Sequence, residues 1–147
     1  MKTLIGYSIA EGIVATGLMT LFVNISGKPV NVPRILGTML LGTTGPGRKV
    51  DRATRTCVVG TLSHYFIGIL FAVVFNLLLL QFQIPAILYS IVFGIAAGLV
   101  AVCVWKLFIT LHPNPPLIPV QFFPSIFMGH IILSFGIFLM MRLITAW

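Results

Sequence analysis

The sequence predicts an all-α integral membrane protein, a bundle of four transmembrane helices within one domain of residues 1–147. Only 7% of the residues are charged, and 59% are hydrophobic. A soluble domain carries about 25% charged residues, so this chain has too few charges to cover a surface in water. Four apolar segments have the ~20 residues that a helix needs to cross about 30 Å of hydrocarbon. Because a backbone in lipid must satisfy its own hydrogen bonds, these segments are expected to be helices.

The predicted spans cover about residues 3–24, 56–80, 85–109 and 122–143. A basic link, residues 25–55, joins the first two spans, and a proline-rich link, residues 111–124, joins the last two. Within the basic link, Val32–Leu41 is predicted to form a short helix with Pro33 in its first turn. Its apolar residues indicate a position at the membrane interface. The prolines of the second link predict an extended, non-helical segment.

The positive charge of the chain is concentrated in the basic link. Six of the nine Lys and Arg residues lie there: Lys28, Arg34, Arg48, Lys49, Arg52 and Arg55. A basic loop between apolar spans is typical of a membrane protein whose loop stays in the cytoplasm. We therefore expect a cytoplasmic basic link, both termini outside, and no nucleic-acid partner despite the net charge of +7.

The two halves of the chain resemble each other. The segment Tyr7–Ala15 (YSIAEGIVA) matches Tyr89–Ala97 (YSIVFGIAA) at six of nine positions. Each half continues with a proline-containing link and then a helix with one histidine about eight residues in, His64 or His130. We interpret the chain as two duplicated helix hairpins related by an axis along the membrane normal.

Three ionisable side chains, Glu11, His64 and His130, lie well inside the predicted spans. Such groups are costly in lipid, so function is the first hypothesis for them. The histidines lie at similar depth, about 12 Å from the cytoplasmic ends of their helices. They are predicted to bond neighbouring helices, to line a polar path for protons, ions or a small solute, or to ligate the iron of haem b. Glu11 is interpreted either as a packed, hydrogen-bonded group or as a proton or cation site.

Small residues flank these candidates at a spacing of four. On the second span the series is Gly60, His64, Gly68, Ala72 and Asn76. Gly12 and Gly94 occupy corresponding positions on the first and third spans. Small residues at this spacing let helices approach closely. They are predicted to pack around the site, to leave room for a flat ligand, or to support a homo-oligomer or larger membrane complex.

Catalytic motifs are absent from the sequence, and its two acids, Glu11 and Asp51, are predicted at opposite sides of the membrane. We therefore expect no enzymatic activity and no cofactor. The favoured function is a non-enzymatic binding or transport protein in the lipid bilayer. The alternatives are an electron-transfer subunit that holds haem b through His64 and His130, its only predicted metal, and a structural subunit of a membrane complex.

The second span also carries a family resemblance. The run Gly60 to Ala72, with His64, Tyr65, Gly68 and Phe71 between them, resembles a family of small, uncharacterised four-span bacterial membrane proteins. Further similarity comes from Gly12, Ala15, Thr16 and Met19, and from Pro113-Asn114-Pro115, His130 and Phe135-Gly136. The family often has Asp where this chain has Thr20, and Glu11 is not part of its pattern. The resemblance implies a bacterial inner-membrane protein and brings no known activity.

Overall fold

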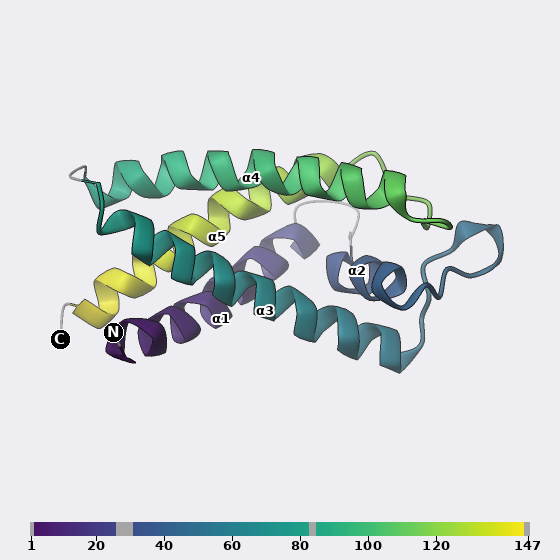
Figure 1. Ribbon diagram of the computed structural model, residues 1–147, viewed down its shortest axis with the longest axis horizontal. Coiled ribbons are helices and arrows are strands. Elements are labelled where there is room, and N and C mark those ends of the chain that lie inside the picture. Colours follow the sequence, from purple (N-terminus) through teal and green to yellow (C-terminus); the bar gives the residue numbers. More distant parts are fainter. Residues whose placement is uncertain (1, 26–30, 83–84, 146–147) are drawn as a thin grey trace.

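The computed structural model describes residues 2–25, 31–82 and 85–145, and the described chain is helical without strands (Figure 1). Its elements are α1 (Lys2–Ile25), α2 (Val32–Leu41), the 3₁₀ turn η1 (Pro46–Arg48), α3 (Thr54–Leu79), α4 (Ala86–Leu111) and α5 (Phe122–Thr145). The predicted all-α fold class is confirmed, and each long helix begins and ends within two residues of the predicted span. Lys28 of the basic link lies outside the described residues.

Four of the helices, α1, α3, α4 and α5, are long and apolar enough to cross a membrane. The 26 residues of α3 and of α4 correspond to about 39 Å of helix, which exceeds a hydrocarbon core of about 30 Å. Between 28% and 44% of each span is buried inside the bundle. Most of their side chains therefore face outward and are apolar, as a lipid environment requires, and the chain is a multi-pass membrane protein.

The helices pack in an order that differs from their order in the chain. In space, α5 lies between α4 and α1, α3 packs on the other side of α1, and α2 packs on α3. Although α3 and α4 are consecutive, they meet only near their junction, where the Phe75 ring lies 4.9 Å from the Tyr89 ring and 5.2 Å from the Phe93 ring. From this contact α3 and α4 diverge, and α2 occupies the widening gap (Figure 1).

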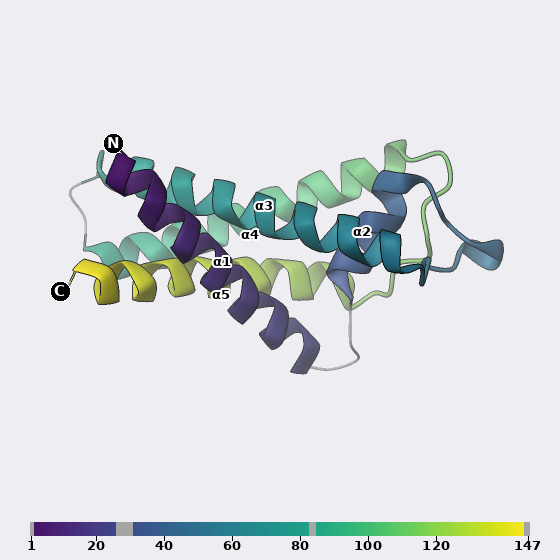
Figure 2. The same cartoon turned by 90° about the horizontal axis from the view of Figure 1, so that it is seen from below.

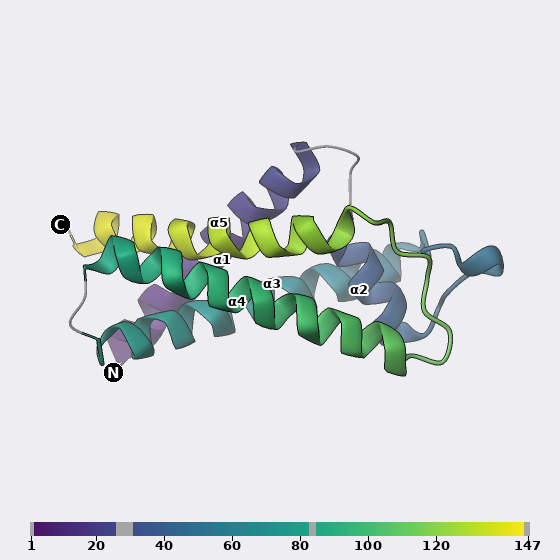
Figure 3. The same cartoon turned by 90° about the horizontal axis from the view of Figure 1, so that it is seen from above.

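Both ends of the described chain lie at one end of the bundle, and the two long links lie at the other (Figure 1). Helix α1 crosses the other helices obliquely, so its last turns stand to one side of the bundle (Figures 2 and 3). At the crossing, a Cβ added to Gly12 would lie 2.6 Å from Ile69 Cα. In the α4–α5 pair, a Cβ added to Gly94 would lie 2.9 Å from Ile131 Cα. Gly12 and Gly94 therefore pack against helices of the same chain. The predicted homo-oligomer stays a prediction.

Helix α2 has the predicted bounds, but its apolar side packs on protein. Asn31 caps it, because its side-chain oxygen accepts a 2.9 Å hydrogen bond from Arg34 N. Six of its residues are buried: Val32, Ile35, Leu36, Gly37, Thr38 and Met39. Several of them form a core with Ala101 of α4 and with Phe122 and Ile126 of α5. The sequence predicted these apolar residues for the membrane interface, whereas the gap between α3 and α4 gives them a protein environment.

The proline-rich link contains no helix between residues 112 and 119, and it is fastened to the basic link. Leu117 N donates to Arg48 O at 2.8 Å, and Arg48 Nε donates to Pro115 O at 2.9 Å. Thr44 Oγ1 donates to Asn114 O at 2.7 Å. These hydrogen bonds join the two links into one surface at the end of the bundle.

Candidate functional site

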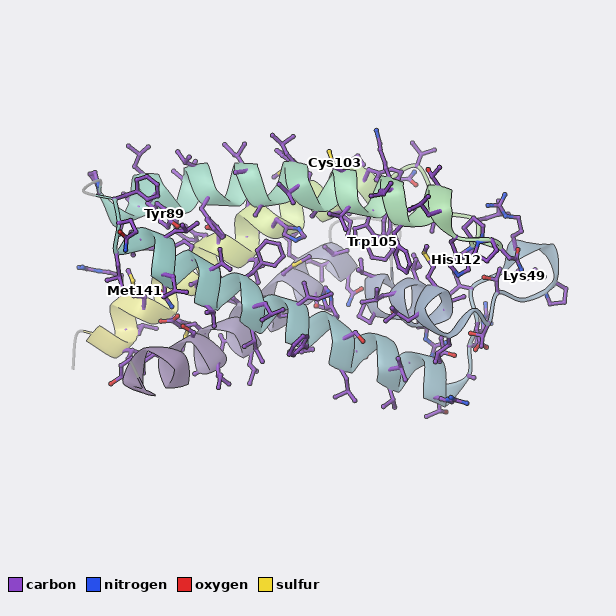
Figure 4. The ribbon with its side chains drawn as sticks, in the orientation of Figure 1. Lys49, Tyr89, Cys103, Trp105, His112 and Met141 are labelled. Carbon is purple, nitrogen blue, oxygen red and sulfur yellow. The ribbon has the colours of Figure 1, made fainter. Side chains whose placement is uncertain are left out.

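The divergence of α3 from α4 leaves a cavity of about 320 Å³ between them, here called the histidine cavity. All five α-helices contribute to its lining, which is mainly aliphatic and aromatic. Ile67 on α3 and Val100 and Val104 on α4 line it and are at least 40% exposed on the outside of the bundle. The cavity therefore opens sideways between α3 and α4, where the surrounding medium is lipid. Trp105 of α4 lines its α2 side, whereas Cys103 points away from the bundle (Figure 4).

Both histidines singled out from the sequence line this cavity. His64 comes from α3 and His130 from α5, and they are 9% and 7% exposed. Sequence reasoning placed them at similar depth but left the rotation of their helices open. The structure turns both toward the same space, because the small-residue face of α3 packs on α1 and α2.

The hydrogen bonds of His64 define which ring nitrogen is free. His64 Nε2 lies 3.3 Å from Thr20 Oγ1, and that hydroxyl donates its one hydrogen to Thr16 O at 2.8 Å. The Thr20 oxygen must therefore accept from His64 Nε2–H. In a neutral imidazole the other nitrogen then carries a lone pair. His64 Nδ1 is thus left as an acceptor.

His130 is held in the complementary way. Its Nδ1 lies 2.8 Å from Ile126 O, the carbonyl one turn earlier on α5. A carbonyl only accepts, so Nδ1 carries the hydrogen, and Nε2 of the neutral ring is the acceptor. The ring of Phe71 meets the His130 ring edge to face, with centroids 5.1 Å apart. Each histidine is therefore fixed through one nitrogen and keeps a second nitrogen for a ligand.

Thr16 also lines the cavity, but its hydroxyl is covered. Thr16 Oγ1 is buried and has no hydrogen-bond partner among the described residues. Gly68 of α3 makes room for it, since a Cβ at that position would lie 1.8 Å from Thr16 Oγ1. An unpaired buried hydroxyl costs about 1–3 kcal/mol, and a ligand in the cavity does not reach this one. Thr16 and Thr20 are four residues apart and so lie on one face of α1, but this spacing does not indicate what the face packs against.

Glu11 is not part of the histidine cavity. It is 2% exposed between α1 and α3, where Asn76 Nδ2 donates to Glu11 Oε2. The same amide nitrogen lies 3.0 Å from Ser8 Oγ, to which it also donates. Asn76 belongs to the last turns of α3, whereas His64 lies three turns earlier. The predicted site is thus divided into a lateral cavity and a closed polar contact between two helices.

The four candidate packing glycines lie where helices cross. Gly12 packs on the backbone of α3, Gly94 on α5, and Gly68 on Thr16. Gly60 packs on α2, where an added Cβ would lie 1.8 Å from Pro33 O. Gly60 and Gly68 lie one turn before and one turn after His64, so they set how closely α2 and α1 approach the cavity.

Within the described residues, no group of three or more His, Cys, Asp or Glu side chains is arranged to hold a metal ion. The histidine cavity offers two imidazole nitrogens, His64 Nδ1 and His130 Nε2. These groups suit hydrogen bonding to a small molecule, and the imidazole nitrogens also have the chemistry of haem ligands.

Comparisons of the chain with family models, curated proteins and solved structures found no match. The assignment of a function therefore rests on the chemistry of the site.

Proposed function

We propose that this membrane protein is a non-enzymatic binding protein for a small lipophilic molecule that carries a hydrogen-bond donor, such as a phenolic or alcoholic hydroxyl. One observation carries the proposal: an apolar cavity, open toward lipid, is lined by two histidines, each with one ring nitrogen that no hydrogen bond among the described residues uses. His64 Nδ1 and His130 Nε2 are both acceptors. Apolar pockets with a few convergent polar groups are the usual form of small-molecule sites.

The ligand class follows from the two imidazoles. Both free nitrogens are acceptors, so a ligand must bring the hydrogen. A pure hydrocarbon would leave these nitrogens unpaired, at a cost of about 1–3 kcal/mol each. A strongly polar solute would lose hydration against the apolar walls. An amphiphile that partitions into the bilayer and enters between α3 and α4 meets both conditions.

The binding test compares 4-hexylphenol with hexylbenzene, which has the same chain and ring but no donor. Trp105 lines the cavity and serves as the fluorescent reporter in a Trp147→Phe background, since the chain has two tryptophans. In nanodiscs, 4-hexylphenol is expected to change Trp105 emission saturably. Its apparent affinity should exceed that of hexylbenzene at least about fivefold, the equivalent of one hydrogen bond of about 1 kcal/mol.

Three variants locate the effect. His64→Phe and His130→Phe each remove one acceptor while retaining an aromatic ring, and each should reduce the preference for the phenol. Glu11→Gln is the matched control, because Glu11 is buried outside the cavity, and it should leave the preference unchanged. Equal binding of both probes, or an equal loss in the Glu11 variant, would contradict the proposal.

Haem b is the second candidate ligand, because both histidines line one cavity and each keeps a free nitrogen. Here the chain would be an electron-transfer subunit. Protein expressed with haem available should then show a Soret band and sharp reduced α and β bands, lost in His64→Ala and His130→Ala. A featureless visible spectrum would remove this candidate and leave the phenol proposal standing.

The sidedness belongs to the same proposal: the chain lies in a bacterial inner membrane with the basic link in the cytoplasm and the termini outside. The support is the group of cationic side chains that lie together on the basic link, Arg34, Arg48, Lys49 and Arg52, and the retention of basic loops in the cytoplasm. A cysteine placed at the exposed Pro46 should resist a membrane-impermeant maleimide in intact cells and react after lysis. Labelling in intact cells would reverse the orientation.

A further inference from the structure

A second hollow lies at the start of α2, on the surface formed by the two links. An open groove of about 810 Å³ runs between the first turn of α2, the basic link and the proline-rich link. Four cationic side chains line it: Arg34, Arg48, Lys49 and Arg52. Lys49 marks its place at the end of the molecule away from the termini (Figure 4). We call it the basic groove.

The groove is built by a fixed backbone. Gly47 has φ +67° and Arg48 has φ +56°, which turns the link back on itself, and Gly45 pairs with Lys49. A non-glycine residue in this left-handed region is strained. The carbonyl and the Nε of Arg48, bonded to Leu117 and Pro115, hold it there. The cationic side chains therefore project from a surface that is ordered by its own hydrogen bonds.

Positive charge in the groove is not balanced by the chain. The protein has two acids, and Glu11 lies between α1 and α3, bonded to Asn76. The carboxylate of Asp51 accepts from Thr56 Oγ1 and from Ala53 N, so it is engaged at the start of α3. Arg34 Nη1 donates to a carbonyl, Arg52 O, at 3.4 Å. Four cations line the groove and Asp51 is not among its lining residues, so the groove favours the binding of an external anion.

The neighbours of the groove indicate that the anion has an apolar body. Ile35, Val50 and Leu117 line the groove beside the cations, and Leu117 is 61% exposed. Val120, next along the link, is 85% exposed. The groove lies where α3 and α5 begin, at the level where spans of this length leave the hydrocarbon core and meet the headgroups. Cations beside exposed apolar side chains at this level match an anionic phospholipid.

We propose that the basic groove binds the phosphate of an anionic phospholipid, with Arg34, Arg48, Lys49 and Arg52 around the headgroup. Leu117 and Val120 lie against its acyl chains. This site is separate from the histidine cavity, because the two are lined by different residues.

Native mass spectrometry of the full chain released from detergent tests the proposal with dioleoyl-phosphatidylglycerol and dioleoyl-phosphatidylcholine, which share the same acyl chains. The double variant Lys49→Gln/Arg52→Gln removes two cations with exposed side chains. Each basic residue near an anionic headgroup is worth about a fivefold change in affinity, so the pair should weaken phosphatidylglycerol binding about 25-fold. The matched control, Lys106→Gln/Arg142→Gln, removes the same charge outside the groove and should bind like the wild type.

A preference for phosphatidylglycerol that is lost in the groove variant and kept in the control supports the proposal. Equal binding of the two lipids, or equal losses in both double variants, overturns it. A competition experiment adds inorganic phosphate at low millimolar concentration to the wild type with phosphatidylglycerol bound. If phosphate displaces the lipid completely, the groove is a site for free phosphate and the lipid assignment is wrong. Circular dichroism of each variant confirms that the helices are retained.

Discussion

Gly60 and Pro33 face each other so closely that a Cβ at position 60 would lie 1.8 Å from the Pro33 carbonyl oxygen. The contact is backbone on backbone and joins α2 to α3. A second contact between the same two helices lies at Gly37 of α2, where a Cβ would lie 2.0 Å from Thr56 O of α3. Helix α2 can therefore occupy its place between α3 and α4 only while both positions are glycine.

Gly60→Ala is expected to destabilise the protein by about 3 kcal/mol, because the backbones of α2 and α3 must separate. Gly6→Ala is the matched control. A Cβ at position 6 meets nothing within 4 Å, and alanine in a helix is favoured over glycine by about 1 kcal/mol. Thermal unfolding in one detergent measures both changes. A Gly60→Ala protein as stable as the wild type would show that α2 does not dock in this way.

The covered, unpaired hydroxyl of Thr16 predicts an effect on stability and none on binding. Thr16→Val removes a buried polar atom without a partner among the described residues, so the ligand-free protein should gain about 1 kcal/mol. The same change should leave 4-hexylphenol binding as in the wild type, because a ligand in the cavity does not reach this atom. The measurements are unfolding without ligand and Trp105 fluorescence with it. A loss of stability in Thr16→Val would mean that the hydroxyl has a partner.

Glu11 and Asn76 are expected to be energetically coupled. Asn76→Leu leaves Glu11 buried without the amide that donates to it, and should cost about 2–3 kcal/mol. Glu11→Gln keeps an acceptor for Asn76 and should cost less. The double variant Glu11→Leu/Asn76→Leu should be less destabilised than the sum of its single variants. Additive single effects in a double-mutant cycle would refute the coupling.

Asp51 predicts a pH dependence at the start of α3. The Thr56 hydroxyl, followed by the Ala53 N–H, holds the pKa of the Asp51 carboxyl below its ordinary value. A depressed pKa contributes stability that is present above the unfolded value of about 3.9 and is lost as pH falls through the folded value. The difference in melting temperature between the wild type and Asp51→Asn should be constant above about pH 5 and shrink below about pH 4. A difference that grows on acidification would contradict this assignment.

Much of the fold was predictable because each span can be recognised from its own residues alone. Length and apolar composition defined the four long helices, and Pro33 with the following apolar run defined α2. The buried face of α3 also follows the predicted series, since Gly60, His64, Gly68, Ala72 and Asn76 are all buried. These features depend on the period of one helix and on no partner.

The site was less predictable because it depends on how helices are rotated and paired. The sequence groups Glu11 with the histidines as an intramembrane ionisable residue, yet its partner is Asn76, which the sequence indicates only as part of the small-residue face of α3. Thr20 decides which nitrogen of His64 is free, and Thr16 has a buried hydroxyl without a partner among the described residues. Neither was a candidate, since a threonine on an apolar helix gives no sign of what it faces. The duplication of the two hairpins stays a prediction.

The central position of α5 has a consequence for biogenesis. Helix α5 follows the other described helices in the chain, yet it packs between α4 and α1, while α3 touches α4 only near their junction. Until α5 enters the bilayer, the hairpin of α1 and α3 has little to hold it against α4. Before that insertion, the histidine cavity also lacks the lining that α5 supplies, including His130. The histidine cavity is therefore completed only when α5 inserts, after α1 to α4 have been made, because His130 and its neighbours on α5 supply part of the lining.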